Sequence, residues 1–157
     1  MSEYFLDASA LVKRYAPEQG STWVNAITTP DSHHSLLVSE ITLVEVSAAL
    51  AAKGRGPSGM SIQARDRALS RFLEDSERLL ILLRVDRTVI DQAVTLVLRH
   101  RLRAYDAVQL ATAIVAKAQL AEHGYPSLTF VTADRDLLGA AGSEGLAVEN
   151  PLDHRDK

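Results

Sequence analysis

Short apolar runs alternate with longer stretches of helical periodicity along this chain, and that alternation limits its possible folds more than any other feature. Strand-like runs occur at residues 4–6, 35–38, 79–83 and 128–132, and helical patterns separate them. Consecutive parallel strands need a crossover connection, which is usually a helix that returns over one face of the sheet. We therefore expect an α/β fold with a parallel central sheet and helices on both faces.

The helices can be placed from apolar residues that recur at intervals of three and four. We expect them over residues 8–15, 19–27, 41–53, 62–77, 86–99 and 107–121, with a short helix after Asp134. Glycine and proline predict a loop at residues 54–59. Residues 79–83 are entirely apolar, which is typical of a fully buried parallel strand, and residues 146–148 can form an edge strand.

The length of 157 residues suits one complete hydrophobic core and is short for two ordinary domains. We expect one domain over residues 1–150 and a polar C-terminal tail over residues 151–157. The absence of cysteine excludes disulfide scaffolds, thiol nucleophiles and thiolate metal sites. No apolar run approaches the roughly 18 residues that a membrane span needs, and the N-terminus lacks a basic signal segment. A cytoplasmic protein without membrane contact is expected.

The formal net charge of -3 is not that of a protein that binds nucleic acid mainly by counterion release. It does not exclude a nuclease, because bound divalent cations reverse the local field that phosphates meet. The glycines between residues 54 and 59 match a dinucleotide-binding pattern, but they follow a helix instead of a strand and include a proline. We interpret that segment as a loop without a ligand.

Acidic residues stand where the predicted strands end and where the predicted helices begin. Asp7 follows the first strand, Asp106 opens an apolar helix, and Asp134 and Asp136 follow the strand at residues 128–132. Glu45 is the only charged residue between residues 41 and 52, on a helix of small and apolar residues. In open parallel sheets, ligands bind beyond the carboxyl ends of the strands, so these acids are the candidate site.

Each acid also has a structural interpretation. Asp7 can act as a simple N-cap, and Glu45 and Asp106 each fit a capping box, the latter with Gln109 as its partner. For Glu45 the local sequence supports the cap and the site equally. Caps alone, however, do not predict acids at two strand ends, at one helix start and inside another helix, all near one edge of one sheet.

Clustered carboxylates repel one another and raise each other's pKa unless a cation neutralises them. Oxygen ligands without cysteine or a histidine pair suit Mg²⁺ or Mn²⁺ better than zinc. Such an ion keeps waters, binds phosphate oxygens and supports in-line attack on a phosphodiester. The leading hypothesis from the residues is therefore metal-dependent phosphodiester hydrolysis.

Four segments, in order along nearly the whole chain, resemble the sequence blocks of PIN domains, particularly those of VapC toxins. They are YFLDASALVKRY from residue 4, SEITLVEVSAAL from residue 39, LRAYDAVQLATA from residue 102 and FVTADRDLL from residue 130. The resemblance places the family's acids on Asp7, Glu45, Asp106 and Asp134. Asp136 is a further candidate ligand, and Ser9 and Thr132 match hydroxyl positions of the family.

The resemblance implies a single PIN-like domain with a four-acid Mg²⁺ or Mn²⁺ site and endoribonuclease activity. It also implies an RNA substrate, a homodimer and neutralisation by a VapB-like antitoxin. Arg99, Arg101 and Arg103 can contact RNA phosphates, although a basic helix end also complements the helix dipole.

Two alternatives remain at this point. One is a PIN-like binding module without turnover, which the intact acid set disfavours. The other is a phosphatase of the haloacid-dehalogenase kind, which would need an acid two positions after Asp7, where Ser9 stands.

Overall fold

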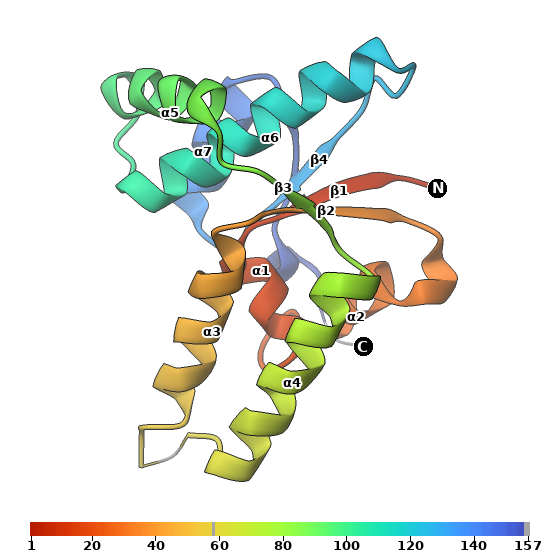
Figure 1. Cartoon of the computed structure of the whole chain (residues 1–157), viewed down its shortest axis with the longest axis vertical. Coiled ribbons are helices and arrows are strands. Elements are labelled where there is room, and N and C mark those ends of the chain that lie inside the picture. Colours follow the sequence, from red (N-terminus) through yellow and green to blue (C-terminus); the bar gives the residue numbers. More distant parts are fainter. Residues whose placement is uncertain (58, 156–157) are drawn as a thin grey trace.

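The computed structural model describes residues 1–57 and 59–155, and its centre is a parallel sheet. The five strands of this part of the chain lie in the order β3-β2-β1-β4-β5, and every neighbouring pair is parallel. Their bounds are Glu3–Leu6 for β1, Ser35–Ser39 for β2, Ile81–Leu83 for β3, Thr129–Val131 for β4 and Ala147–Glu149 for β5. The predicted α/β class with a parallel sheet is confirmed (Figure 1).

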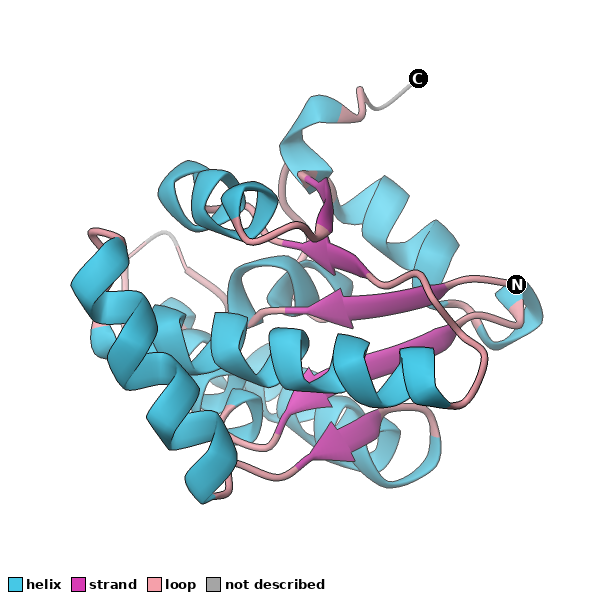
Figure 2. Cartoon of the chain, turned by 90° about the horizontal axis from the view of Figure 1, so that it is seen from above, coloured by secondary structure: helices cyan, strands magenta, loops and turns pink. Residues whose placement is uncertain are grey.

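Helices cover both faces of this sheet (Figure 2). The helices are α1 (Ala8–Leu11), α2 (Ser21–Thr28), α3 (Thr42–Lys53), α4 (Ile62–Arg78), α5 (Arg87–Arg99), α6 (Ala104–Glu122) and α7 (Arg135–Ser143). Helices α5, α6 and α7 lie on one side of the strands, whereas α1, α3 and α4 lie on the other (Figure 1). The expected cover on both faces is therefore present.

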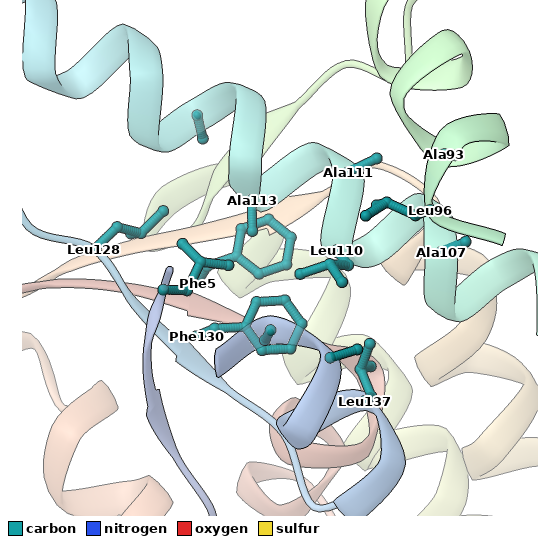
Figure 3. Packing of buried hydrophobic residues seen from close by; sticks show 14 of the residues in the cluster. Phe5, Ala93, Leu96, Ala107, Leu110, Ala111, Ala113, Leu128, Phe130 and Leu137 are labelled. Atoms are coloured by element: carbon teal, nitrogen blue, oxygen red, sulfur yellow. The ribbon is translucent and has the colours of Figure 1, made fainter. Parts of the chain in front are cut away.

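Alternating strand residues feed two separate cores. Phe5, Leu37 and Phe130 belong to the core that also contains residues of α5, α6 and α7. The rings of Phe5 and Phe130 stack with centroids 5.4 Å apart (Figure 3). Their chain neighbours Leu6 and Val131 face the other core with α1, α3 and α4. Because successive strand side chains point to opposite faces, one short apolar run supplies both cores.

Strand β3 differs from its prediction. It begins at Ile81 instead of residue 79 and occupies an edge of the sheet, where it pairs only with β2 in the described structure. The side chain of Ile81 is 48% exposed, so the prediction of a fully buried strand is wrong. An apolar run indicates a strand, but its position in the sheet depends on the strand order, which the run does not encode.

Several helix boundaries also differ from those expected. The first helix is a single α-turn followed by a 3-10 turn at Val12–Arg14, and α2 begins after Gly20, whose φ of +89° suits glycine. Helix α6 begins at Ala104, three residues before its predicted start, so Asp106 lies inside its first turn. This shift decides how Asp106 can act, because it is no longer available as the N-cap.

The C-terminal segment packs back onto the domain. A 3-10 turn at Pro151–Asp153 follows β5, Pro151 is buried, and the ring of His154 stacks on Trp23 of α2 with centroids 4.2 Å apart. Residues 156–157 of the expected tail and residue 58 of the expected loop lie outside the described part of the chain. No helix in the described ranges has both the length and the apolar character needed to cross a membrane.

The strand order places a topological switch point between β1 and β4. From β1 the chain builds outward to β2 and β3, and then it crosses to the other side of β1 to form β4 and β5. Adjacent connections at such a point leave toward opposite faces, which opens a crevice at the carboxyl ends of the two strands. Asp7 follows β1 at this crevice, and Thr132 follows β4.

Candidate functional site

Asp7 is the most tightly held acid of the candidate site. It caps α1, because its Oδ1 accepts from the backbone N–H of Ala10 at 3.0 Å. The same oxygen accepts from the hydroxyl of Ser9 at 2.7 Å, and Oδ2 accepts from the hydroxyl of Thr132 at 2.6 Å. The cap interpretation is thus correct, but it describes only one of three donors around this carboxylate.

Burial dominates the electrostatics of Asp7. The residue is 3% exposed, and loss of solvent raises the pKa of its carboxyl group from the ordinary 3.8 to about 6. The three donors oppose this shift because they stabilise the charged form, whereas the nearby charge of Asp106 adds to it. A carboxylate in this position is stabilised by any positive charge that reaches it.

Hydroxyl groups tie the end of β1 to the end of β4. The Oγ1 of Thr132 donates to Asp7 and accepts from the backbone N–H of Asp134 at 3.1 Å. The Oγ of Ser9 likewise accepts from the backbone N–H of Ala133 at 3.0 Å. These bonds fix the loop after β4 against the start of α1, and so they set the distance between Asp7 and Asp134.

Asp134 and Asp136 sit at the start of α7. Asp134 is the N-cap, with its Oδ1 accepting from the backbone N–H of Leu137 at 3.0 Å. Asp136 lies in the first turn of the same helix. Both acids therefore also complement the positive end of the α7 dipole.

Glu45 lies in the first turn of α3, and its carboxylate is bonded to another helix. Its Oε1 accepts from Nε2 of Gln109 on α6 at 2.8 Å, and the same nitrogen donates to the hydroxyl of Thr42 at 2.8 Å. The N-cap of α3 is Ile41, without a side-chain bond, so the capping-box interpretation of Glu45 is wrong. Partial burial raises the pKa of Glu45; the bond from Gln109 lowers it and the charge of Asp106 raises it.

Asp106 is the electrostatic centre of the group. Partial burial raises its pKa, the charge of Asp134 raises it further, and Arg103 opposes the shift. Asp106 in turn raises the pKa of both Asp7 and Glu45. The N-cap of α6 is Arg103, without a side-chain bond, and the cap interpretation of Asp106 is therefore wrong. Asp106 thus interacts electrostatically with Asp7, Glu45 and Asp134.

An open cavity of about 310 Å³ lies over the outer part of this group. Its lining consists of Arg101, Leu102, Arg103, Asp106, Asp134 and Asp136. Arg99, the third arginine of the basic segment, instead pairs with Glu144 at 3.0 Å. Arg101 and Arg103 thus line the same cavity as the acids, and this cavity can bind both a polyanion and a cation.

The donor set fits a hard divalent cation. It consists of carboxylate oxygens. Burial and a neighbouring carboxylate raise the pKa values of Asp7, Glu45 and Asp106, and a bound cation relieves that repulsion. Within residues 1–57 and 59–155, no three acidic or histidine side chains lie close enough to enclose an ion by themselves. That openness suits Mg²⁺, which usually keeps several waters and takes substrate oxygens as ligands.

Gln109 is the site neighbour that the sequence did not identify. Its position three residues after Asp106 suggested a capping partner, but the structure directs it to Glu45 on another helix. A signal was present, because Gln109 is a large polar residue within an apolar stretch of α6 and is 1% exposed. Such a side chain needs a buried partner, and only the tertiary structure shows which one.

Sequence comparison finds relatives over almost the entire length. The PIN domain family model matches residues 4–142. Two curated relatives from Mycobacterium tuberculosis, Ribonuclease VapC45 of strain CDC 1551 / Oshkosh and Ribonuclease VapC49 of strain ATCC 25618 / H37Rv, are each 33% identical to this chain over 144 residues. Each of these alignments covers 92% of both chains.

Structural comparison finds the same architecture. A toxin–antitoxin complex from Klebsiella pneumoniae contains a chain that matches with a TM-score of 0.60 at 18% identity, covering 95% of this chain and 98% of that one. Mycobacterium tuberculosis VapC20, described as a sarcin–ricin loop cleaving toxin, matches with a TM-score of 0.60 at 16% identity, covering 92% and 97%. The sequence match over most of the chain and this shared fold together show that the protein belongs to the PIN-domain family.

Proposed function

We propose that this protein is a Mg²⁺- or Mn²⁺-dependent endoribonuclease and the toxin of a toxin–antitoxin pair. The observation that carries the proposal is the buried Asp7 carboxylate, held by three donors at the switch point. The nearby charge of Asp106 on α6 acts on it, and Asp106 itself interacts electrostatically with Glu45 and Asp134. The names of the curated relatives, which are ribonucleases, support the choice of RNA among phosphodiesters.

The proposed metal ligands are Asp7, Glu45, Asp106 and Asp134, with Asp136 as an additional ligand at the rim. When bound there, a divalent cation supplies an activated water at neutral pH and stabilises the charge that develops on the phosphate. The chain itself orients the carboxylates: Ser9 and Thr132 fix Asp7, and the start of α7 fixes Asp134. The acids thus provide an open binding site in which the cation relieves the repulsion between carboxylates and takes its remaining ligands from water and RNA.

The proposed RNA surface lies beside the open cavity, on the segment that leads into α6. Arg101 and Arg103 line the cavity and make no ion pair with a described residue, so both can contact phosphates. Tyr105, directly before Asp106, is 67% exposed and offers a ring on which an unpaired base can stack. An RNA strand that passes over these residues brings its backbone to Asp106 and Asp134.

The proposed protein partners are a VapB-like antitoxin and a second copy of this chain. The structural relatives support the first, since they include a Rickettsia felis VapBC2 complex at 16% identity with a TM-score of 0.60, covering 96% of this chain and 98% of that one. Co-expression with the product of the neighbouring gene is expected to yield a stable complex and to relieve growth inhibition. Harmless overexpression without any small co-purifying protein would contradict the toxin role and leave the nuclease role intact.

The nuclease proposal is tested by cleavage of a fluorogenic RNA with the wild type and with Asp7→Asn. Asparagine keeps the size and most of the N-cap capacity, so folding is expected to be preserved. It removes the charge that holds the cation, and cleavage is expected to fall by at least about 100-fold. Asp31→Asn is the matched control. Asp31 is exposed and precedes β2, at the amino ends of the strands, whereas the candidate site lies at their carboxyl ends.

Three results would contradict parts of the proposal. Cleavage by Asp7→Asn at the wild-type rate would show that Asp7 is a helix cap and not a catalytic metal ligand. Cleavage that persists without any divalent cation would exclude the metal-dependent chemistry. RNA binding by a wild type that never cleaves, with Mg²⁺ or Mn²⁺ present, would identify a PIN-like binding module.

A further inference from the structure

Gln109 forms a buried bridge between two helices that each carry an acid of the proposed site. Its Nε2 donates to Oε1 of Glu45 and to Oγ1 of Thr42, both at 2.8 Å. Glu45 and Thr42 belong to the first turn of α3, whereas Gln109 lies one turn after Asp106 on α6. One face of α6 therefore presents one acid directly and contacts a second acid through Gln109.

The orientation of this amide follows from the chemistry of its partner. A carboxylate only accepts hydrogen bonds, so the nitrogen of Gln109 must face Glu45. The amide oxygen, Oε1, is then buried and has no hydrogen-bond partner among the described residues. An unpaired buried acceptor is unfavourable for folding, whereas an apolar side chain of the same size would leave none. Stability alone therefore does not explain glutamine here.

We propose that Gln109 is a positioning residue that orients the carboxylate of Glu45 for metal binding, an inference that rests on the function proposed above. The bond engages Oε1 of Glu45 and restricts rotation of the carboxylate. In the described part of the chain, Oε2 of Glu45 has no hydrogen-bond partner and stays available as a ligand. Hydrogen bonds that orient ligating carboxylates commonly change metal affinity about 10- to 100-fold when they are removed.

The test measures the affinity for Mn²⁺ in the absence of RNA. Electron paramagnetic resonance gives the concentration of free Mn²⁺, and the bound fraction follows from it. Gln109→Met keeps the length and volume of the side chain and removes the donor, and it is expected to weaken Mn²⁺ binding about tenfold. Gln109→Glu, which places an acceptor opposite Glu45, is expected to weaken it more. Circular dichroism melting checks that both variants are folded.

Thr112→Val is the matched control. Thr112 is also buried on α6, where its hydroxyl donates to the carbonyl of Val108 at 2.7 Å, and it has no bond to Glu45. The Thr112→Val variant is expected to have a lower melting temperature and an unchanged affinity for Mn²⁺. This result would separate loss of stability from loss of positioning. A double-mutant cycle adds a second criterion: in a Glu45→Gln background, Gln109→Met should have no further effect on affinity.

Each outcome decides the inference. Weaker Mn²⁺ binding by Gln109→Met that disappears in the Glu45→Gln background supports it. Unchanged affinity in folded Gln109→Met overturns the positioning role and leaves the nuclease proposal intact. A loss that persists in the Glu45→Gln background also overturns it, because Gln109 then acts by another route. A wild type that binds no Mn²⁺ at concentrations that support cleavage overturns the metal site and with it the positioning role, while the ribonuclease activity stands.

Discussion

The acids of the candidate site form two groups that the fold treats differently. Asp7 and Glu45, the inner acids, each accept a hydrogen bond from a side chain on a distant element, Thr132 for Asp7 and Gln109 for Glu45. The outer acids line the open cavity and have no such side-chain donor among the described residues; they are Asp106, Asp134 and Asp136. The inner acids are fixed before any ligand arrives, whereas the outer acids can adjust to the cation and to RNA.

The largest expected effect concerns the stability of the metal-free protein. Burial raises the pKa of Asp7 to about 6, so the folded state binds a proton more tightly than the unfolded chain. The contribution of Asp7 to stability is therefore fully present below about pH 4 and is lost as pH rises through 6, by about 3 kcal/mol in total. Asp7→Asn should remove this loss and stabilise the apo protein at pH 7.

Urea unfolding at several pH values, with a chelator present, measures this effect. The wild type should lose stability relative to Asp7→Asn as pH rises from about 4 to 8, and saturating Mn²⁺ should restore it in the wild type only. Glu45 and Asp106 act in the same direction in both proteins because burial raises their pKa values as well. The difference between the two stability curves therefore reports Asp7 together with its repulsion from Asp106. If the unfolding free energies of the two proteins changed with pH in parallel, burial would not raise the pKa of Asp7.

A second change tests how much the hydroxyl donor Thr132, which bonds the inner acid Asp7, adds to stability. Thr132→Val keeps the shape of a fully buried side chain but removes its bond to Asp7 and leaves the backbone N–H of Asp134 without its acceptor. We expect a loss of about 2 kcal/mol in unfolding free energy. Thr95→Val on the exposed face of α5 is the control. Equal small losses in both variants would mean that the hydroxyl bridge adds little.

A third change separates the two roles of an outer acid. Asp134 caps α7 and also lines the cavity. Asp134→Asn should retain the cap, whereas Asp134→Ala should lose about 1 kcal/mol of stability. Both variants lose the charge, so both should bind Mn²⁺ more weakly to a similar degree. If only the alanine variant bound Mn²⁺ more weakly, the cap and not the charge would be responsible.

The smallest effect is expected at Asp136. Its side chain lies at the cavity rim and has no hydrogen-bond partner among the described residues. Asp136→Asn should change the unfolding free energy by less than about 0.5 kcal/mol and should weaken Mn²⁺ binding less than Asp134→Asn does. A loss of Mn²⁺ affinity as large as that of Asp134→Asn would place Asp136 among the principal ligands and would blur the division between inner and outer acids.

The local pattern of the sequence predicted most of the fold. Apolar runs and periodicity located the five strands and seven helices of residues 1–57 and 59–155 to within a few residues, because burial on a sheet or on one face of a helix imposes a short repeat. It failed where the answer depends on distant segments. Residues 79–83 indicated a buried strand, yet β3 lies at an edge, since the strand order depends on how the whole chain crosses over.

For the candidate site, the sequence by itself determined which acids stand at the ends of strands and the starts of helices, and a parallel sheet brings those positions to one edge. The tertiary structure decided which donors meet them. Thr132 reaches Asp7 across 125 residues, and Gln109 reaches Glu45 across 64. Such partners cannot be found from local spacing, because hydrogen bonds between distant elements depend on their packing, and that packing is determined by the chain as a whole.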